Sequence, residues 1–168
     1  MTQVMKYTVF STPFGWITCF GSAKGLRKMT LPQLSPQQSM DLIGEEIDNA
    51  EHDPDFFNDV IQQVLAYFDG EEIAFNVKLD FGDATPFQKA VWEAARTIPF
   101  GQTESYSGIA RRINKPGAAR AVGTALRNNP LPLIVPCHRI IGADGGLCGF
   151  AGGFAMKEAL LTLEKASD

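Results

Sequence analysis

Residues 106–127 read YSGIARRINKPGAARAVGTALR, and this stretch decides how the second half of the chain folds. Apolar residues at 109, 110 and 113 recur at helical spacing, which predicts a short helix over residues 106–113. Asn114 then has the side chain of a helix N-cap, and Pro116 stands in the first turn of the helix that would follow. A short helix, a turn and a second helix predict a helix-turn-helix.

The second of these helices has unusually small side chains. One face is expected to carry Ala118, Ala121, Val122, Ala125 and Leu126, and the opposite face Gly117, Arg120, Thr124 and Arg127. Glycine in a helix costs about 1 kcal/mol relative to alanine, so the glycines need an explanation. Tight packing against a neighbouring helix explains the alanine face. It does not explain the face that bears Arg120, where the close approach of another surface is the better explanation.

The start of the second half is marked by Thr85-Pro86-Phe87-Gln88. Threonine as N-cap, proline in the first turn and glutamine at the third position form a capping box, which predicts a helix over residues 86–98. We therefore place a domain boundary between residues 84 and 85, giving domains 1–84 and 85–168. The length of 168 residues fits two compact halves or one domain with an insertion.

The first half alternates β-branched and aromatic residues and then becomes helical. Residues 7–10 and 16–20 predict a hairpin, with turn chemistry between them, and residues 26–31 predict a third strand. Two acidic amphipathic helices are expected near residues 38–49 and 55–67, followed by a strand at 73–79. The predicted fold class is α/β (α+β), with a small α/β first domain and a mainly helical second domain.

The formal net charge of −4 argues against a general nucleic-acid binder, because phosphate contacts need concentrated lysine and arginine. The charge is unevenly distributed, however: residues 1–84 carry −8 and residues 85–168 carry +4. Between residues 96 and 139, seven basic side chains oppose only Glu104. Either a polyanion docks on this segment or it is a solvated charged face.

Composition excludes several classes of protein. Hydrophobic residues make up 45% and charged residues 20%, which is typical of a folded soluble domain and not of a disordered or fibrous chain. The longest uncharged run, residues 7–23, is interrupted by proline and glycine and cannot form a membrane span. Three cysteines at these spacings match no disulfide framework, and no secretory signal is recognisable, so we expect reduced thiols and a cytoplasmic protein.

The clearest chemical signal is the pair Cys137 and His138. An apolar run over residues 131–135 predicts a strand that leads into this pair. A thiolate is a nucleophile, and a base or a positive field favours it; His138 and Arg139 supply both. Because neighbouring residues of a strand point to opposite faces, a water would have to relay the proton. Glu164 is the candidate partner for the other ring nitrogen of His138.

These residues belong to a longer string. Pro136-Cys137-His138-Arg139 is preceded by Ala119-Arg120-Ala121-Val122-Gly123 and Asn129-Pro130, and is followed by Gly152-Gly153 and Lys157-Glu158. Over residues 85–164 this string resembles the O6-alkylguanine-DNA alkyltransferases, also called methylated-DNA-protein-cysteine methyltransferases. The first half is similar only through Ser11-Thr12-Pro13-Phe14-Gly15 and its strand pattern. The resemblance implies a ribonuclease-H-like α/β domain there that supports the site.

The resemblance implies direct-reversal DNA repair with base flipping. An alkyl group on O6 of guanine, with O4 of thymine as a second candidate, would pass irreversibly to Cys137, once per molecule. His138 would deprotonate the thiol through a water and Glu164 would orient His138. Tyr106 would donate a proton toward N3 of the flipped guanine, and Arg120 would fill the vacated stack.

The resemblance also assigns the supporting residues and the partner. Asn129 would hold the turn between the recognition helix and the reacting segment. The remaining DNA contacts would come from Ala118, Ala119, Gly123 and Arg127, and the base pocket from Pro132, Val135, Ile140, Phe150 and Ala151. The partner would be double-stranded DNA carrying O6-alkylguanine, bound in the minor groove by a monomer. We expect no cofactor and no metal, because the first half offers only Cys19 and His52 as soft ligands.

Three other functions stay open at this point. A DNA-binding module without transfer chemistry would not need Cys137. A helix-turn-helix regulator that senses redox state would cycle Cys137 and Cys148 between thiol and disulfide. A Cys/His hydrolase would turn over repeatedly on an acyl substrate. Capture of an alkyl group on Cys137 separates all three from the repair hypothesis.

Overall fold

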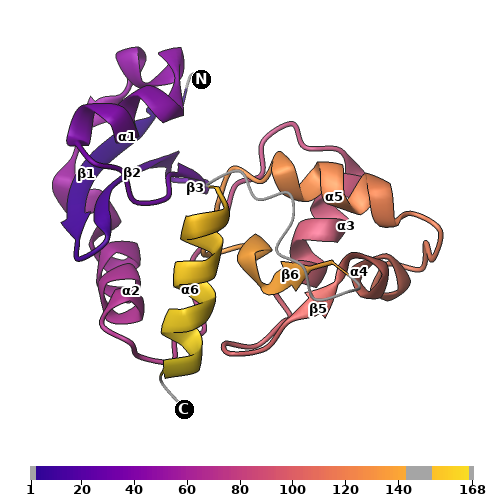
Figure 1. Cartoon of the computed structure of the whole chain (residues 1–168). Helices are drawn as coiled ribbons and strands as arrows, with labels where there is room; N and C mark the ends of the chain where they lie inside the picture. The colour runs from indigo at the N-terminus through magenta and orange to yellow at the C-terminus, as the bar shows by residue number, and fades with distance from the viewer. Residues whose placement is uncertain (1–2, 143–152, 167–168) are drawn as a thin grey trace. The chain divides into compact units, whose positions relative to one another are not determined.

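The computed structural model describes residues 3–142 and 153–166 (Figure 1). Contacts divide the chain into two compact units, Met1–Gly82 and Asp83–Asp168. The division lies two residues before the boundary predicted between residues 84 and 85. Within the described residues no helix is both long and apolar enough to cross a membrane.

The first unit is built on a four-stranded sheet in the order β3-β2-β1-β4. Its strands are β1 (Lys6–Thr12), β2 (Gly15–Ser22), β3 (Gly25–Met29) and β4 (Glu51–His52). The predicted hairpin is present as the antiparallel pair β1 and β2, and β4 adds to β1 in parallel. Gly15 has a φ of 135° at the hairpin turn, and a Cβ there would lie 2.5 Å from the Gln33 carbonyl oxygen. Only glycine satisfies both conditions.

Helices α1 (Pro36–Ile43) and α2 (Asn58–Phe68) contact this sheet. The prediction of one helix over residues 38–49 was wrong, because Gly44 adopts a φ of 95° and ends α1, and a separate 3-10 helix covers Glu45–Asn49. Helix α2 is preceded by a 3-10 turn, Pro54–Phe57, that the Asp53 side chain caps. The strand β4 between these helices was not predicted, since two residues give no periodic signal.

The strand predicted over residues 73–79 was also wrong. Only Leu79 forms a bridge, with Leu26 of β3. The reason is visible at Asn76, whose backbone N–H donates to Gln63 Oε1 at 2.8 Å and whose carbonyl accepts from Gln63 Nε2 at 3.1 Å. The side chain of Gln63 on α2 therefore satisfies backbone groups that a neighbouring strand would otherwise bind.

Cys19 lies in the core of the first unit, with no exposed surface. Burial alone raises the pKa of this thiol far above its ordinary value of 9.0. The thiolate is the reactive form of cysteine, so Cys19 is unreactive in the folded protein. This burial removes one of the two soft metal ligands that the sequence of the first half offered.

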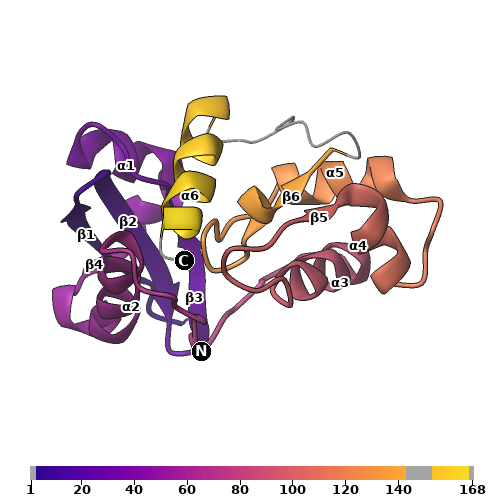
Figure 2. The same ribbon diagram turned by 60° about the horizontal axis from the view of Figure 1, so that its bottom comes forward.

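The second unit contains α3 (Pro86–Ala95), α4 (Tyr106–Arg112), α5 (Ala119–Arg127) and α6 (Phe154–Ala166), with a short parallel pair β5 (Glu104–Ser105) and β6 (Ile140–Ile141). Helices α3, α4 and α5 contact one another (Figure 2). The predicted capping box at Thr85 is present, but α3 ends at Ala95, three residues before the expected end at residue 98. The buried Trp92 on α3 donates from Nε1 to the Ala125 carbonyl at 2.9 Å and so fixes α5.

The helix-turn-helix is present with a different turn from the one predicted. Asn114 does not cap α5; it adopts a φ of 62° and helps to end α4. Helix α5 begins only at Ala119, after Ala118, which makes no side-chain cap. The predicted faces hold with one correction: Val122, Ala125 and Leu126 are buried and Arg120 is exposed, but Ala121 is exposed too.

Candidate active site

The segment that leads to Cys137 is a turn and not the predicted strand over residues 131–135. Val135 N–H donates to the Leu131 carbonyl at 2.9 Å, and Leu133 between them has a φ of 75°. Proline at positions 130 and 132 removes two backbone donors from this run, so it cannot form a regular ladder. The apolar run predicted a strand, but it forms a buried turn. Periodicity alone does not distinguish these two structures.

Asn129 closes this turn. Its Oδ1 accepts from Leu131 N–H at 2.9 Å, and its Nδ2 donates to the Val135 carbonyl at 3.0 Å. The side chain therefore spans both ends of the turn between α5 and Cys137. Removing it would leave one backbone donor and one acceptor without these partners.

Cys137 opens a 3-10 turn, Cys137–Arg139, whose end is tied to the helix-turn-helix. Ile140 N–H donates back to the Cys137 carbonyl. Ile140 and Ile141 then pair with Glu104 and Ser105, and the Ser105 side chain caps the N-terminus of α4. Three residues that the sequence singled out are therefore joined through hydrogen-bonded backbone: Cys137 and His138 in the turn and Tyr106 at the start of α4.

Glu164 on α6 lies against His138, and both side chains are almost fully buried. His138 Nε2 and Glu164 Oε2 are 2.5 Å apart. The same carboxylate accepts from Arg139 Nε at 2.9 Å, Arg139 Nη2 at 3.1 Å and Gly101 N–H at 3.0 Å. Four contacts fix the carboxylate, and the carboxylate in turn fixes one ring nitrogen of the imidazole.

Burial lowers the pKa of His138 below its ordinary value of 6.5, and the nearby Arg139 and Lys157 lower it further. Glu164 opposes this shift, because its negative charge favours the imidazolium. At neutral pH the imidazole is therefore neutral and able to accept a proton. Since Nε2 is held by Glu164, proton exchange toward Cys137 has to use Nδ1.

Cys137 is partly exposed. Burial raises its pKa above the ordinary 9.0, and a hydrogen bond with the Asn129 side chain and the charge of Lys157 act in the opposite direction. The prediction that Arg139 supplies the positive field was wrong, because its guanidinium is committed to Glu164 and to the Ile98 carbonyl at 2.8 Å. Sequence reasoning missed Lys157 in this role, because nothing in the sequence distinguishes it from Lys165 on the same helix and its burial is evident only in the fold.

Seven cations between residues 96 and 139 are not equivalent. Arg96 lies 3.7 Å from Glu93, Arg112 pairs with Glu104 at 3.1 Å, and Arg139 is buried against Glu164. The four that make no ion pair with any residue that the structure describes, and that are all exposed, are Arg111, Lys115, Arg120 and Arg127. These four are the exposed cations of the segment whose charge no described carboxylate neutralises.

The small residues of α5 also face outward. Among the described residues, a Cβ at Gly117 would meet no atom within 4 Å, and one at Gly123 would meet the ring of Tyr106 at an ordinary 3.7 Å. Packing inside the protein therefore does not require glycine at either position. The approach of a surface from outside, expected from the sequence, stays a prediction for Gly117 and Gly123, and Ala118 and Ala119 beside them are half-buried.

The predicted base-pocket residues differ in their exposure. Pro132 is partly exposed, whereas Val135 and Ile140 have no exposed surface. Because they are fully buried, the side chains of Val135 and Ile140 belong to the core that supports the turn. The Val135 carbonyl accepts from Asn129 Nδ2 and from Cys137 N–H. Phe150 and Ala151 lie outside the described residues, as does Cys148.

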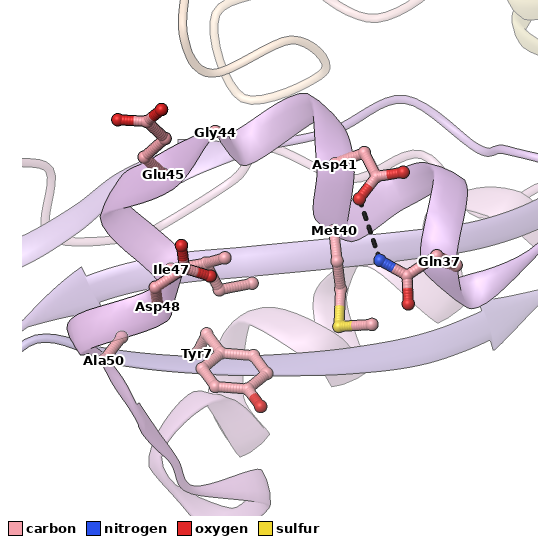
Figure 3. A pocket seen from close by; sticks show the side chains of 9 residues that line it. All are labelled: Tyr7, Gln37, Met40, Asp41, Gly44, Glu45, Ile47, Asp48 and Ala50. Carbon is pink, nitrogen blue, oxygen red and sulfur yellow. Dashed lines mark hydrogen bonds between the residues drawn. The ribbon is translucent and has the colours of Figure 1, made fainter.

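A pocket of about 520 Å³ opens in the first unit (Figure 3). Its lining consists of Tyr7, Gln37, Met40, Asp41, Gly44, Glu45, Ile47, Asp48 and Ala50. Three carboxylates on this lining repel phosphate, so the pocket is not a DNA site. In the described part of the chain no three His, Cys, Asp or Glu side chains gather closely enough to hold a metal ion.

Comparison with known proteins covers both units. The family model for the 6-O-methylguanine DNA methyltransferase ribonuclease-like domain matches residues 5–81, and the model for the DNA binding domain of the same family matches residues 86–166. The methylated-DNA–protein-cysteine methyltransferase of Methanosarcina acetivorans is 42% identical over 95% of this chain and 98% of its own length. The protein of that name from Mycobacterium tuberculosis is also 42% identical, over 97% of this chain and 94% of its own.

Solved structures agree with these matches. The crystal structure of the Mycobacterium tuberculosis O6-methylguanine methyltransferase superimposes with a TM-score of 0.82, covering 98% of this chain and 95% of that one at 42% identity. A crystal structure of the M. tuberculosis protein in complex with DNA gives a TM-score of 0.82 at 43% identity, covering 96% and 94%. The expected mixed α/β fold, with a ribonuclease-like first half, is confirmed. This chain belongs to the 6-O-methylguanine DNA methyltransferase family.

Proposed function

We propose that this chain repairs DNA by accepting an alkyl group from O6 of guanine onto Cys137. The observation that carries the proposal is the buried pair His138 and Glu164, next in sequence to a partly exposed thiol and joined by backbone to a helix-turn-helix. A buried neutral imidazole held by a carboxylate is the arrangement that removes a proton from a nucleophile. Family membership supplies the substrate class.

The reaction balances without a cofactor. The Cys137 thiol gives its proton through a water to His138 Nδ1, and the sulfur then attacks the alkyl carbon. The S–C bond forms as the bond between that carbon and O6 breaks, and the electron pair of this bond stays on guanine. Tyr106 donates a proton toward N3, so guanine leaves neutral, and the proton taken up by His138 then replaces, through solvent, the one that Tyr106 gave. The product is a thioether, which water does not hydrolyse, so each molecule acts once.

A base inside a duplex hides its O6 substituent, so the nucleotide has to leave the stack, at a cost of a few kcal/mol. Arg120 is an exposed long side chain in the first turn of α5 that makes no ion pair with any described residue, and we assign it to the space that the base vacates. Close approach of this helix to a minor groove needs little bulk at the contact, which fits Gly117, Ala118, Ala119 and Gly123.

We further propose that the protein works as a monomer in the cytoplasm. Cys137, His138, Glu164 and the helix-turn-helix all belong to one unit of one chain, so a second copy supplies nothing to the reaction. An acceptor thiol that reacts once must stay reduced until it meets its substrate, and the cytoplasm keeps thiols reduced.

The deciding experiment is mass spectrometry of the protein after incubation with a duplex that carries O6-methylguanine. We expect one methyl group per protein molecule, located on the peptide that contains Cys137, and none on Cys137→Ser with DNA binding retained. Repeated turnover would indicate a hydrolase, and a reversible disulfide without methyl capture would indicate a redox sensor. Reduced, folded protein that binds the duplex and gains no methyl group would overturn the proposal.

Salt dependence tests the assignment of the DNA surface. With Arg120 in the stack, three exposed cations remain to contact phosphates: Arg111, Lys115 and Arg127. A plot of the logarithm of the binding constant against the logarithm of the salt concentration should therefore have a slope of roughly −3. Arg127→Gln should make that slope shallower by about 1. Lys89→Gln removes an exposed cation from α3, outside the helix-turn-helix, and serves as the control with an unchanged slope. Equal slopes for both variants would contradict the assignment.

A further inference from the structure

One oxygen of the Glu164 carboxylate is shared between Arg139 and His138. This oxygen, Oε2, accepts from Arg139 Nη2 at 3.1 Å and lies 2.5 Å from His138 Nε2. The other oxygen, Oε1, accepts from Arg139 Nε at 2.9 Å and from Gly101 N–H at 3.0 Å. The guanidinium is therefore bound across both oxygens of the carboxylate that holds the proposed base.

The guanidinium of Arg139 is itself fixed by the segment that follows α3. Its Nη1 donates to the Ile98 carbonyl at 2.8 Å, and its central carbon lies 5.8 Å from the centre of the Phe100 ring. Arg139 is 5% exposed and Glu164 is 1% exposed. Water screens such a buried ion pair only weakly, so the charge of Arg139 acts strongly on any group that touches Glu164.

A buried carboxylate can act on a neighbouring imidazole in two ways. It can accept a hydrogen bond from the neutral ring, which orients the ring and leaves the other nitrogen able to accept a proton. It can also favour the imidazolium, because the second proton balances the negative charge. The imidazolium cannot act as the base of the proposed reaction. A guanidinium does not lose its proton in proteins, so Arg139 supplies a permanent positive charge to the same carboxylate.

We propose that Arg139 is a positioning residue that balances the charge of Glu164, so that the shared carboxylate orients the His138 ring without drawing a second proton onto it. This inference rests on the proposed function, because it concerns how the base of that reaction stays neutral. The competing explanation is that Arg139 only ties α6 to the segment after α3. The two explanations differ in whether the charge at position 139 acts on His138.

The charged groups around His138 act in the directions that the proposal requires. Helix α6 contributes Glu164 and Lys157, and the turn itself contributes Cys137 and Arg139. Burial lowers the pKa of His138 most, Glu164 raises it, and the charges of Arg139 and Lys157 lower it. Lys157 is present in every variant of Arg139, so a difference between such variants reports on position 139.

The test is the titration of His138 by NMR in the full chain without DNA. The sequence has two histidines, and the exposed His52 is an internal control. Arg139→Met removes the charge, whereas Arg139→Lys keeps the charge without the planar fork of donors. We expect the pKa of His138 to be higher in Arg139→Met than in Arg139→Lys by about one, which is roughly tenfold in the ratio of imidazolium to imidazole. His52 should titrate alike in wild type and both variants.

The lysine variant separates charge from geometry. Loosening of the contact with Glu164 would affect both variants, because neither side chain reproduces the fixed pair of hydrogen bonds that arginine makes. Equal pKa values of His138 in the two variants would therefore overturn the proposal. Arg112→Met removes an arginine that pairs with Glu104 in the same unit, and this matched control should leave the titration of His138 unchanged. The titration uses neither DNA nor the reaction of Cys137, so its failure is distinguishable from failure to capture a methyl group.

A second measurement needs no substitution and keeps the proposal testable if Arg139→Met unfolds. In wild-type protein with ¹⁵N-labelled arginine, the Nε–H resonance of Arg139 reports on its hydrogen bond to Glu164. If the carboxylate is shared, protonation of His138 weakens this bond, and the Arg139 resonance should move with the same midpoint as the His138 ring. The resonance of Arg112 should stay constant over that range. An Arg139 resonance that stays constant while His138 titrates would reject the proposal.

Discussion

Replacing Glu164 with glutamine should slow alkyl transfer to Cys137 by about 10² to 10³, with binding to duplex DNA unchanged. Proton transfer by a positioned base contributes on this order. Glutamine has the shape of glutamate but no charge, so it no longer favours the protonated form of His138. The pKa of His138, already lowered by burial, should fall further. The imidazole becomes a weaker base for the thiol proton.

The rate of alkyl transfer should depend on pH in a way that tests this role of His138 and Glu164. In wild type, His138 must be neutral to accept the proton, so transfer should fall as pH decreases through its lowered pKa, below 6.5. In Glu164→Gln the loss of transfer rate relative to wild type should be largest near neutral pH. It should narrow at alkaline pH, where the thiol ionises without help from the imidazole. An unchanged profile would count against the relay. Glu158→Gln, at an exposed position of the same helix, is the control.

The same substitution should also destabilise the protein, because it leaves the buried guanidinium of Arg139 without its carboxylate. Breaking a buried ion pair by removing one partner costs about 3 kcal/mol or more of unfolding free energy. The double variant Arg139→Met with Glu164→Gln removes both charges and should recover much of that stability. Transfer should stay slow in the double variant, since His138 still lacks its carboxylate. Recovery of both stability and transfer would show that Glu164 acts only on folding.

The helix-turn-helix could be predicted from the sequence, and the candidate pair Cys137 and His138 could be singled out, because their signals are local. The capping box at Thr85 and the spacing of apolar residues in α4 depend on residues within a few turns. The contact of His138 with Glu164 is different. It joins positions 26 residues apart, and the sequence identified Glu164 only as a candidate near the end of the chain.

The errors have a common physical origin. Asn114, residues 73–79 and residues 131–135 were each assigned from residue type, but specific hydrogen bonds and backbone angles, which residue type does not reveal, determine the outcome. Gln63 satisfies the backbone of Asn76, and Asn129 closes the turn at 131–135. Lys157 was overlooked for the same reason, since its burial follows from how α6 lies on the reacting turn. Such hydrogen-bond partners leave no periodic pattern in the sequence.

Arg120→Ala is the other substitution with a large expected effect, and its effect should depend on the substrate. If Arg120 replaces the flipped nucleotide in the stack, its loss should raise the free-energy barrier of the reaction on duplex DNA by a few kcal/mol. A cost of about 3 kcal/mol corresponds to a rate roughly 100-fold lower. Free O6-methylguanine needs no extrusion, so its reaction with Cys137 should be nearly unchanged.

A control variant separates extrusion from simple loss of charge. Arg127→Ala removes a neighbouring exposed cation from the same helix and should weaken DNA binding, but transfer at saturating duplex should stay close to wild type. Arg120→Ala should remain slow at saturating duplex, because the missing step follows binding. A duplex in which the damaged guanine is unpaired costs less to open and should recover part of the rate. Equal losses on duplex and free base would instead place Arg120 in the chemistry of the thiol, which its exposed position on α5 argues against.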